Sequence, residues 1–444
     1  MKTVTRPAIR QMVFLLIALS RTIITIAFWI ATRISFRIQV RGQQHDKRLP
    51  STYFGMAHRR DLDPIILIPI ITFFRGWSAL SNSLHFALRG DAFSPGFLAR
   101  IVMEPRFIAR FLRPINAGTV LPWLGALPLE SLFRPTEEWI RELLRVSGDA
   151  RAGDLLAPMI IYELAHASGE SYEQIAGARL SQLLAWRYQA PLQHFYSSEI
   201  ILGPARRKID QRLVARMKQQ IIDLGAWLQS GGSVLGSPEG QLSPDGTFRP
   251  INSALHRILR YAPASTTILP WYPTYDYMTT RRRISVFIEI GTAIENAPTL
   301  SKEQLEQQLY HSWIQAARFT CSLLASGFVM EASRAERSFT LDELSVAIHR
   351  QALSLAEAGR HVDRQLLHPG QARKLAARFL AYARRHHLVY RSGPNAWAPS
   401  PTHYNIKVRP MEVIYDMAPL LYCWNELQAL LGEQGGMEGP DDGL

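Results

Sequence analysis

A histidine and an aspartate five residues apart are the residues of this chain whose types and spacing best suit catalysis. His58 and Asp63 lie in the stretch STYFGMAHRRDLDPIILIPI, residues 51–70. A strand is predicted over 51–57, and Asp63-Pro64 predicts the start of a helix, because proline is favoured in the first helical turn. The carboxylate can hold the imidazole in one tautomer while the free ring nitrogen takes a proton from a hydroxyl. Such a pair supplies a base without a nucleophile of its own, which suits transfer of an acyl group to an alcohol.

A second motif lies further along the chain, at residues 230–248, with the sequence SGGSVLGSPEGQLSPDGTF. An apolar run at 233–235 predicts a strand that leads into Pro-Glu-Gly at 238–240. A polar Asp-Gly turn follows at 245–246. The first motif alone also fits a surface histidine beside a helix-capping aspartate, so the second motif is needed to make the prediction of a site specific.

The two motifs together resemble the glycerolipid acyltransferase superfamily, which contains the lysophosphatidic acid and glycerol-3-phosphate acyltransferases. The family's Asn-His-x-x-x-x-Asp motif is matched at 57–63, and its Phe-Pro-Glu-Gly-Thr-Arg motif at 237–242. A later apolar strand with prolines is matched at 267–273, TILPWYP. The resemblance covers residues 36–295 and implies an α/β fold with a mixed sheet flanked by helices.

The chain departs from the family pattern at several motif positions. Ala57 replaces the usual asparagine, Ser237 replaces phenylalanine, and Gln241-Leu242 replace Thr-Arg. In the family that arginine lies near the phosphate of the acceptor, so Leu242 leaves the acceptor open. Arg249 stands where a basic residue often follows the turn, and it would compensate.

The resemblance also implies a strand that ends in a phosphate-binding arginine, and two segments match it. The preferred one is EIILGPARR at 199–207, with Arg206 or Arg207 as the phosphate ligand; the other is GALPLESLFR at 125–134. A solvated, basic helix start is the alternative interpretation of Arg206 and Arg207.

The resemblance assigns roles to individual residues. His58 would take the proton of the acceptor hydroxyl, and Asp63 would orient the imidazole. Glu239 would bind acceptor hydroxyls or organise the loop, and backbone donors around Gly240 would stabilise the oxyanion. The substrate-binding residues are therefore expected to be Pro238, Glu239, Gly240, Arg206, Arg207 and Arg249. No metal or other cofactor is implied; acyl-CoA or acyl-carrier protein would be the co-substrate.

Composition limits the classes that the chain can belong to. With 444 residues and 47% hydrophobic residues it can bury a large core, and it is not a polytopic membrane protein. A net charge of +13 indicates anionic partners such as phospholipid headgroups, phosphorylated substrates or nucleic acid. The two cysteines, Cys321 and Cys423, lack metal or redox spacing, which favours a reducing compartment.

The N-terminus predicts membrane association. Residues 12–34, MVFLLIALSRTIITIAFWIATRI, are apolar for about the length of a bilayer span, but Arg21 lies in the middle. A charge is costly there, so a helix lying in one leaflet is expected. A cleaved signal peptide and a buried core helix are the alternatives. Flanking arginines, at positions 6, 10, 33, 37 and 41, favour the cytoplasmic face.

Three domains are expected: a membrane-associated helix at 1–35, an acyltransferase domain at 36–297 and a mainly helical domain at 298–444. A helical insertion is predicted at about 135–195, with helices at 134–146, 155–166 and 172–188, the last one starting after Ser171. In the C-terminal domain, helices are predicted at 302–330, from Thr340 with Glu343 completing a capping box, and at 369–387. A strand is predicted at 387–391, before a Gly-Pro turn. Two helices followed by such a short hairpin resemble a winged-helix module.

The sequence leaves the function between two classes. The leading expectation is acyl transfer from a thioester to 1-acyl-glycerol-3-phosphate, giving phosphatidic acid, with glycerol 3-phosphate as the alternative acceptor. The other class is a membrane-anchored protein with a degenerate acyltransferase core, whose basic C-terminal module binds nucleic acid or a protein. We do not expect nucleic acid as a partner, because a solvated helix end explains the basic residues at 384–387. The oligomeric state is left open.

Overall fold

The computed structural model describes most of residues 36–60, 63–75, 84–89, 121–280, 283–402 and 418–432, together with residue 118 and single positions between 19 and 34. The chain forms two compact units. The first unit contains residues 1–86 and 225–444, and the second contains residues 87–224. The predicted insertion at about 135–195 lies inside the second unit.

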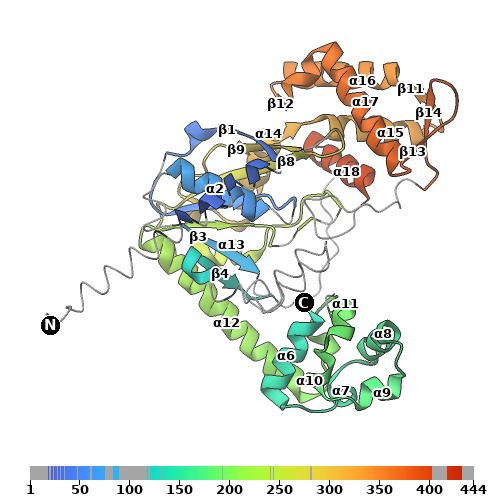
Figure 1. The fold of residues 1–444 in the computed structure, drawn as a ribbon. Helices are drawn as coiled ribbons and strands as arrows, with labels where there is room; N and C mark the ends of the chain where they lie inside the picture. The colour runs from blue at the N-terminus through green and yellow to red at the C-terminus, as the bar shows by residue number, and fades with distance from the viewer. Residues whose placement is uncertain are drawn as a thin grey trace, which may run out of the picture. The chain divides into compact units, whose positions relative to one another are not determined.

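The first unit is built around a mixed, mostly parallel sheet. Its strands lie in the order β1-β9-β8-β2-β7-β3, and β1, β9, β8 and β3 are labelled in Figure 1. Their bounds are Phe36–Arg41 (β1), Thr52–Met56 (β2), Leu84–Arg89 (β3), Ser233–Gly236 (β7), Thr267–Asp276 (β8) and Ile284–Ile290 (β9). The pairings of β1 with β9, of β2 with β7 and β8, and of β3 with β7 are parallel, whereas β8 and β9 run antiparallel. Helices flank the sheet, so the predicted α/β class with a mixed sheet is confirmed.

The central strands lie where the sequence predicts them. Their residues are buried along their whole length. All residues of β2, β7 and β8 are buried. A strand covered on both faces has a nearly continuous apolar sequence, which is what the runs at 51–57, 233–235 and 267–273 show. The helices α2 (Asp63–Arg75), α13 (Ser253–Leu259) and α14 (Lys302–Ala316) belong to the same unit.

The second unit is mostly helical, as predicted for 135–195. Its helices are α6 (Thr136–Ser147), α7 (Ala152–Leu155), α8 (Pro158–Ser168), α9 (Tyr172–Gly177), α10 (Leu180–Leu183), α11 (Gln189–Leu192) and α12 (Pro204–Gln229), whose last residues, from Gly225, belong to the first unit. Short strands are β4 (Ala126–Leu129), β5 (Arg134–Pro135) and β6 (Phe195–Tyr196). The core contains fully buried side chains such as Trp139, Ile161 and Leu164.

The prediction of one helix over 172–188 is wrong. Ala178 and Arg179 are extended, and Arg179 forms a bridge with Arg151, so the segment divides into α9, α10 and a 3-10 turn at Trp186–Tyr188. The predicted start is confirmed, because Ser171 and Gln174 form a capping box at the N-terminus of α9.

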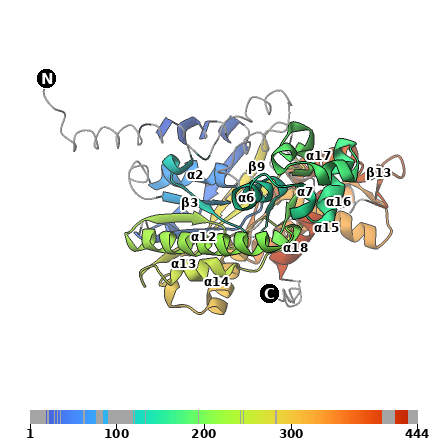
Figure 2. The same cartoon turned by 90° about the horizontal axis from the view of Figure 1, so that it is seen from below.

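Helices dominate the chain after residue 300 (Figures 1 and 2). The elements are β10 (Arg318–Phe319), α15 (Cys321–Arg334), β11 (Phe339–Thr340), α16 (Leu341–Glu357), β12 (His361–Val362), the 3-10 turn η8 (Arg364–Leu367), α17 (Pro369–Arg385), β13 (Val389–Arg391), β14 (Ala396–Pro399) and α18 (Pro419–Leu431). The strands β11, β14 and β13 form an antiparallel sheet in that order. The capping box of Thr340 and Glu343 is present, as predicted.

The prediction of a single helix over 302–330 is wrong. Arg318 and Phe319 leave the helical path to pair with β12, and Thr320 then caps α15 by accepting the amide hydrogen of Leu323. The buried guanidinium of Arg318 pairs with Glu289 of the sheet. This pair draws the chain into an extended turn between α14 and α15.

A buried carboxylate joins the sheet to the helices that follow. Asp276, the last residue of β8, accepts hydrogen bonds from the Ser322 amide (3.2 Å) and the Ser322 hydroxyl. The same hydroxyl accepts the amide hydrogen of Met278 at 3.1 Å. Burial raises the pKa of Asp276 to about 6. The joint ties the N-terminus of α15 to the end of β8.

The described residues between Leu19 and Ile34 are helical, and the rest of the apolar segment predicted at 12–34, including Arg21, lies outside the described residues. Within the part of the chain that the structure describes, no helix combines the length and the apolar character needed to cross a membrane.

Candidate active site

The predicted histidine and aspartate lie in contact. His58 follows β2, and Asp63 is the first residue of α2. The Nδ1 atom of His58 is 3.2 Å from Oδ2 of Asp63. The Asp63 side chain is fully buried, whereas 21% of the His58 side chain is exposed. The acid is therefore shielded, and the ring keeps access to solvent.

Four groups fix the carboxylate of Asp63. The backbone amides of Arg59 and Arg60 each donate to Oδ2 at 2.7 Å, and the hydroxyl of Tyr275 donates to Oδ1. The His58 ring completes the set. A carboxylate accepts hydrogen bonds only. The His58 Nδ1 atom is then the donor, and Nε2 is left to take a proton from a substrate.

Glu239 connects the second motif to the first. Its Oε2 atom accepts the amide hydrogen of His58 at 2.9 Å, and its Oε1 atom accepts that of Arg249 at the same distance. The side chain is 4% exposed. Of the two roles predicted for Glu239, this geometry matches the organisation of the loop, because both oxygens already accept backbone hydrogens.

Pro238 and Gly240 shape the turn that carries Glu239. Gly240 has a φ of 70°, and a Cβ atom there would lie 3.0 Å from the Asn252 side chain, so glycine is required. The Pro238 carbonyl accepts the Asn252 amide hydrogen at 2.8 Å. The Gly240 amide donates to the carbonyl of Ser237 at 3.0 Å. The turn already uses this amide, which had been a candidate oxyanion donor.

Arg249 lies beside the site through its backbone, and its side chain is half-buried. Its carbonyl accepts the hydroxyl hydrogen of Tyr310 at 2.7 Å. The Nε atom of its guanidinium is buried, with no hydrogen-bond partner among the residues that the structure describes. A buried donor without a partner is costly unless a ligand supplies one.

The sequence prediction missed two buried arginines between His58 and Asp63. Arg59 and Arg60 are each 1% exposed. Their guanidinium groups stack on aromatic rings: Arg59 on Phe248 (4.3 Å) and Tyr272 (5.1 Å), and Arg60 on Tyr422 (4.2 Å), Tyr277 (5.3 Å) and Tyr275 (5.5 Å). Two arginines directly after the histidine were the available signal, but their aromatic partners are far away in the sequence.

The C-terminal helix α18 supports both loops of the site. The hydroxyl of Tyr422 donates to the carbonyl of Arg59 at 3.1 Å, across 363 residues. Asn425 donates to the carbonyl of Asp245 at 3.0 Å, and Glu426 accepts the hydroxyl hydrogen of Tyr272 at 2.9 Å. A Cβ atom at Gly246 would lie 2.1 Å from the Tyr422 carbonyl oxygen, so this approach requires glycine.

The predicted phosphate ligands Arg206 and Arg207 belong to the second unit. They lie exposed in the first turn of α12. The guanidinium of Arg206 is 3.9 Å from Glu199 and 3.8 Å from Asp210. The expected strand at 199–207 is wrong: the segment is a 3-10 turn followed by the start of a helix.

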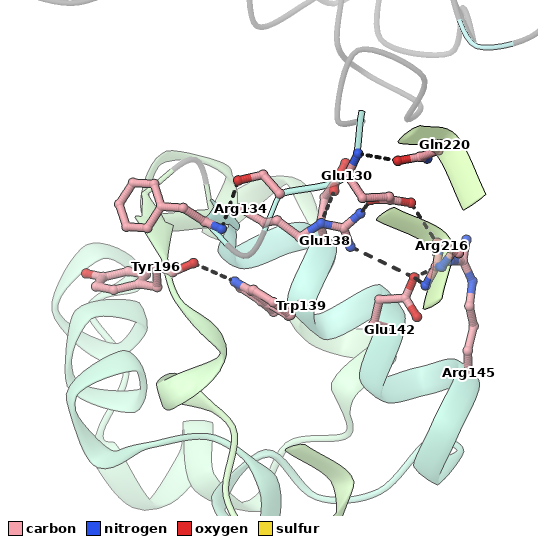
Figure 3. A network of polar contacts seen from close by, with 11 residues as sticks. Glu130, Arg134, Glu138, Trp139, Glu142, Arg145, Tyr196, Arg216 and Gln220 are labelled. Atoms are coloured by element: carbon pink, nitrogen blue, oxygen red, sulfur yellow. Dashed lines mark hydrogen bonds and ion pairs between the residues drawn. The ribbon is translucent and has the colours of Figure 1, made fainter. Parts of the chain in front are cut away.

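The other candidate segment, 125–134, does contain a strand, β4, but its arginine is buried in an ion-pair network of the second unit (Figure 3). Arg134 contacts Glu130, Glu138 (3.6 Å) and Glu142 (3.9 Å). Arg216 of α12 contacts Glu130 (3.2 Å) and Glu142 (2.9 Å), and Arg145 contacts Glu142 (2.8 Å). Three arginines face three glutamates, so the charges of the network cancel.

The arginines also control the ionisation of the network. Burial alone would raise the pKa of Glu142, but the hydrogen bond and charge of Arg216, with Arg145 and Arg134, lower it below its ordinary value. Trp139 fixes the neighbouring turn by donating to the Tyr196 carbonyl at 2.8 Å. This arrangement stabilises α6 against α12 within the second unit.

The remaining nucleophiles and metal-binding side chains form no second site among the described residues. No group of histidine, cysteine, aspartate or glutamate side chains there suits a metal ion. Cys321 and Cys423 are buried, and burial raises the pKa of both thiols, that of Cys423 to about 12. Neither sulfur is therefore available as a thiolate nucleophile.

Comparison with models of known protein families gave no match to this chain, and comparison with curated proteins gave none either.

Proposed function

We propose that this chain is an O-acyltransferase that moves a fatty acyl group from a thioester to a hydroxyl of a glycerophosphate lipid precursor. One observation carries the proposal: the 2.9 Å hydrogen bond from the His58 amide to Glu239, which joins two motifs 181 residues apart. With Asp63 against Nδ1 of His58, it gives an oriented base beside a rigid Pro-Glu-Gly turn. This supports the family resemblance independently of the spacing within each motif.

The proposed reaction needs one base. Nε2 of His58 takes the proton of the acceptor hydroxyl while its oxygen attacks the thioester carbon. Asp63 stabilises the imidazolium that forms. The tetrahedral intermediate then collapses, the carbon–sulfur bond breaks, and the thiolate leaves with the proton returned by the imidazolium. The thioester is already activated, so positioning of the two substrates supplies much of the remaining rate.

The proposed acceptor is 1-acyl-glycerol-3-phosphate, with phosphatidic acid as the product. The buried Nε atom of Arg249, without a partner among the described residues, supports this side chain as a ligand of the acceptor phosphate. Guanidinium groups suit phosphate because they donate two parallel hydrogen bonds. Arg206 and Arg207 are proposed as further contacts to phosphate, in the second unit.

Membrane association at the cytoplasmic face is part of the proposal. Large apolar side chains of the helical segment at 19–34 are exposed, namely Leu19, Ile23, Ile26, Trp29, Ile30 and Ile34. Their spacing of three and four residues puts most of them on one side of a helix, and Thr22, Thr25 and Thr32 are buried instead. A helix of this kind suits insertion into one leaflet, where the lipid acceptor lies.

We also propose that the C-terminal region is a winged-helix module. The order α15, β11, α16, α17, β13, β14 combines three helices with an antiparallel sheet in which β14 lies between β11 and β13. The helices pack on one another through buried faces, and the β13–β14 hairpin follows α17 directly.

The purified full chain tests the proposal in an acyl-transfer assay. Labelled acyl-CoA and acyl-carrier protein are each offered with 1-acyl-glycerol-3-phosphate, glycerol 3-phosphate or a phosphate-free monoacylglycerol. We expect phosphatidic acid as the main product, and at least about 10²-fold slower formation of it by His58→Ala. Turnover with glycerol 3-phosphate alone would change the acceptor, and turnover only with monoacylglycerol would remove the phosphate-binding role of Arg249. If neither acyl donor supports transfer, the proposal that this chain is an acyltransferase is wrong.

A further inference from the structure

One stretch of the C-terminal region carries charge of a single sign. Between residues 369 and 402 the sequence contains no aspartate or glutamate. Its basic residues are Arg373, Lys374, Arg378, Arg384, Arg385 and Arg391, and all six are exposed. The stretch comprises α17 and the β13–β14 hairpin, so the positive charge is concentrated on one helix and on the hairpin that follows it.

Helix α17 packs against α16 and follows it after a connection that contains β12 and η8. Helix α16 ends at Glu357, and η8 leads into α17 at Pro369 (Figure 1). One side of α17 is buried against the module, through Ala372, Leu375, Ala376, Phe379, Leu380 and Ala383. The opposite side is exposed along the length of the helix.

The exposed side of α17 alternates basic and small side chains. Lys374, Arg378 and Arg385 lie three to four residues apart in line with Ala377 and Ala381, which are exposed as well. Small side chains let the helix backbone approach a partner while the long ones reach past it on both sides. Such a surface suits a groove lined with negative charge better than a flat surface.

Most of these cations are not used by the fold. Arg373 pairs with Asp342 at 2.8 Å, and Arg391 stacks on Trp397 at 5.6 Å. For Lys374, Arg378, Arg384 and Arg385, no ion pair is seen among the described residues. Like charges crowded on one helix repel one another, and an anionic partner relieves that repulsion.

We propose that the exposed face of α17, together with the β13–β14 hairpin, binds duplex nucleic acid. Helix α17 enters the major groove, which is wide enough for one α-helix, and Arg391 of the hairpin contacts the phosphate backbone. A bilayer is the less suitable partner, because Tyr390 is the one large apolar side chain exposed between 369 and 402. This binding goes beyond the proposed acyl transfer and does not depend on it. It replaces the expectation from the sequence that nucleic acid is not a partner, because the structure places the cations of α17 on one exposed face.

The test measures the affinity of the full chain for a fluorescent two-turn DNA duplex of mixed sequence, as a function of salt. The triple variant Lys374→Gln, Arg378→Gln, Arg385→Gln should bind at least about tenfold more weakly, and the slope of log K against log salt should fall by about 2.7 in magnitude. A matched variant removes three exposed charges elsewhere in the first unit, Arg257→Gln, Arg260→Gln and Arg350→Gln. It should change the affinity less than about twofold.

A second variant leaves the charge unchanged. Ala377→Gln with Ala381→Gln enlarges the side chains that would face the groove, so it should weaken duplex binding severalfold without weakening binding to vesicles of phosphatidylcholine and phosphatidylglycerol. Unchanged duplex affinity in the triple variant, or an equal loss in the matched variant, would overturn the proposal. So would binding to those vesicles with no binding to the duplex. His58→Ala should bind the duplex like the parent chain, so loss of transfer and loss of nucleic-acid binding are separable.

Discussion

Both units bury charged side chains, but they compensate them in different ways. In the first unit, Asp63 is held by two backbone amides, a tyrosine and the His58 ring. In the second unit, Arg134 and Arg216 are held by glutamates of their own neighbourhood. The first arrangement leaves one ring nitrogen for a substrate, whereas the second pairs its charges with one another.

This difference separates a site that can do chemistry from one that stabilises. A carboxylate fixed by neutral donors can hold the neighbouring imidazole in the tautomer that a general base needs. An ion-pair network whose charges balance has no net charge that could act on a ligand. Removing one of its members, however, leaves a buried charge without compensation. The same residue types therefore imply different roles according to what completes their hydrogen bonds.

The largest effect is expected when the imidazole of His58 is removed. His58→Ala should lower acyl transfer about 10²- to 10⁴-fold, because the step loses its general base. The rate of phosphatidic acid formation from labelled acyl-CoA measures the loss. His166→Ala, an exposed histidine in α8, is the control and should keep the parent rate. Equal activity of both variants would remove the catalytic role of His58.

The network of the second unit should respond in stability and not in chemistry. Arg134→Met removes the ion pairs to Glu130, Glu138 and Glu142 and leaves two arginines beside three buried glutamates, so the free energy of unfolding should fall by about 3–5 kcal/mol. Urea unfolding followed by circular dichroism measures it. Arg141→Met removes a half-exposed pair with Glu137 on the same helix and should cost less than about 0.5 kcal/mol. Similar losses of unfolding free energy in both variants would show that the buried network contributes no more to stability than an exposed ion pair.

Glu239 should combine both effects, since it binds the backbone of the loop that carries His58. In Glu239→Gln the side-chain oxygen still accepts one backbone amide hydrogen, but the side-chain NH2 group faces the other backbone amide and cannot accept its hydrogen. We expect a loss of about 1.5–3 kcal/mol in unfolding free energy, together with slower transfer. Glu295→Gln, an exposed partner of Lys47, is the control for the change of charge. A Glu239→Gln variant with parent stability would contradict the bridging role.

Acid should weaken the second unit through Glu142. Its pKa is lowered in the folded state, so its contribution to stability is complete above its unfolded pKa and is lost as the pH falls through the folded pKa. The protection of amides in peptides from 139–183, measured relative to the intrinsic exchange rate at each pH, should therefore fall as the pH drops below about 4.5. Glu142→Gln should show a shallower dependence on pH. An unchanged dependence would assign the acid response to other groups.

The smallest effect is expected at the exposed end of α12. Arg206→Ala should raise KM for the acceptor a few-fold and leave kcat unchanged, because it removes binding without touching the base. Steady-state kinetics with 1-acyl-glycerol-3-phosphate measures it, with Arg212→Ala on the same helix as the control. A fall in kcat without a change in KM would be inconsistent with a phosphate ligand.

The sequence predicted what depends on local pattern. Strands buried on both faces have continuous apolar sequences, so the runs at 233–235 and 267–273 mark β7 and β8. Caps with their own short signatures, such as those at Ser171 and Thr340, were also found. The pairing of His58 with Asp63 belongs to this class, because five residues of turn and helix start determine it.

Features that depend on distant residues were missed. The break between α14 and α15 follows from the pairing of Arg318 with Glu289, which the pattern at 302–330 does not reveal. The rings around Arg59 and Arg60 come from β8, the Asp-Gly turn and α18, and no local rule brings them together. The sequence therefore predicted the contact between His58 and Asp63 better than the aromatic rings that surround Arg59 and Arg60.

The support that α18 gives to the His58 loop has a consequence for synthesis of the protein. The contact between Tyr422 and Arg59 spans 363 residues, so the ribosome must make most of the chain before the loop has its last partner. Nascent chains stalled before residue 418 should therefore lack transferase activity, and chains extended at the C-terminus by a linker that carries residue 431 outside the exit tunnel should gain it. The His58 loop would therefore gain its last support only after the ribosome has finished the chain.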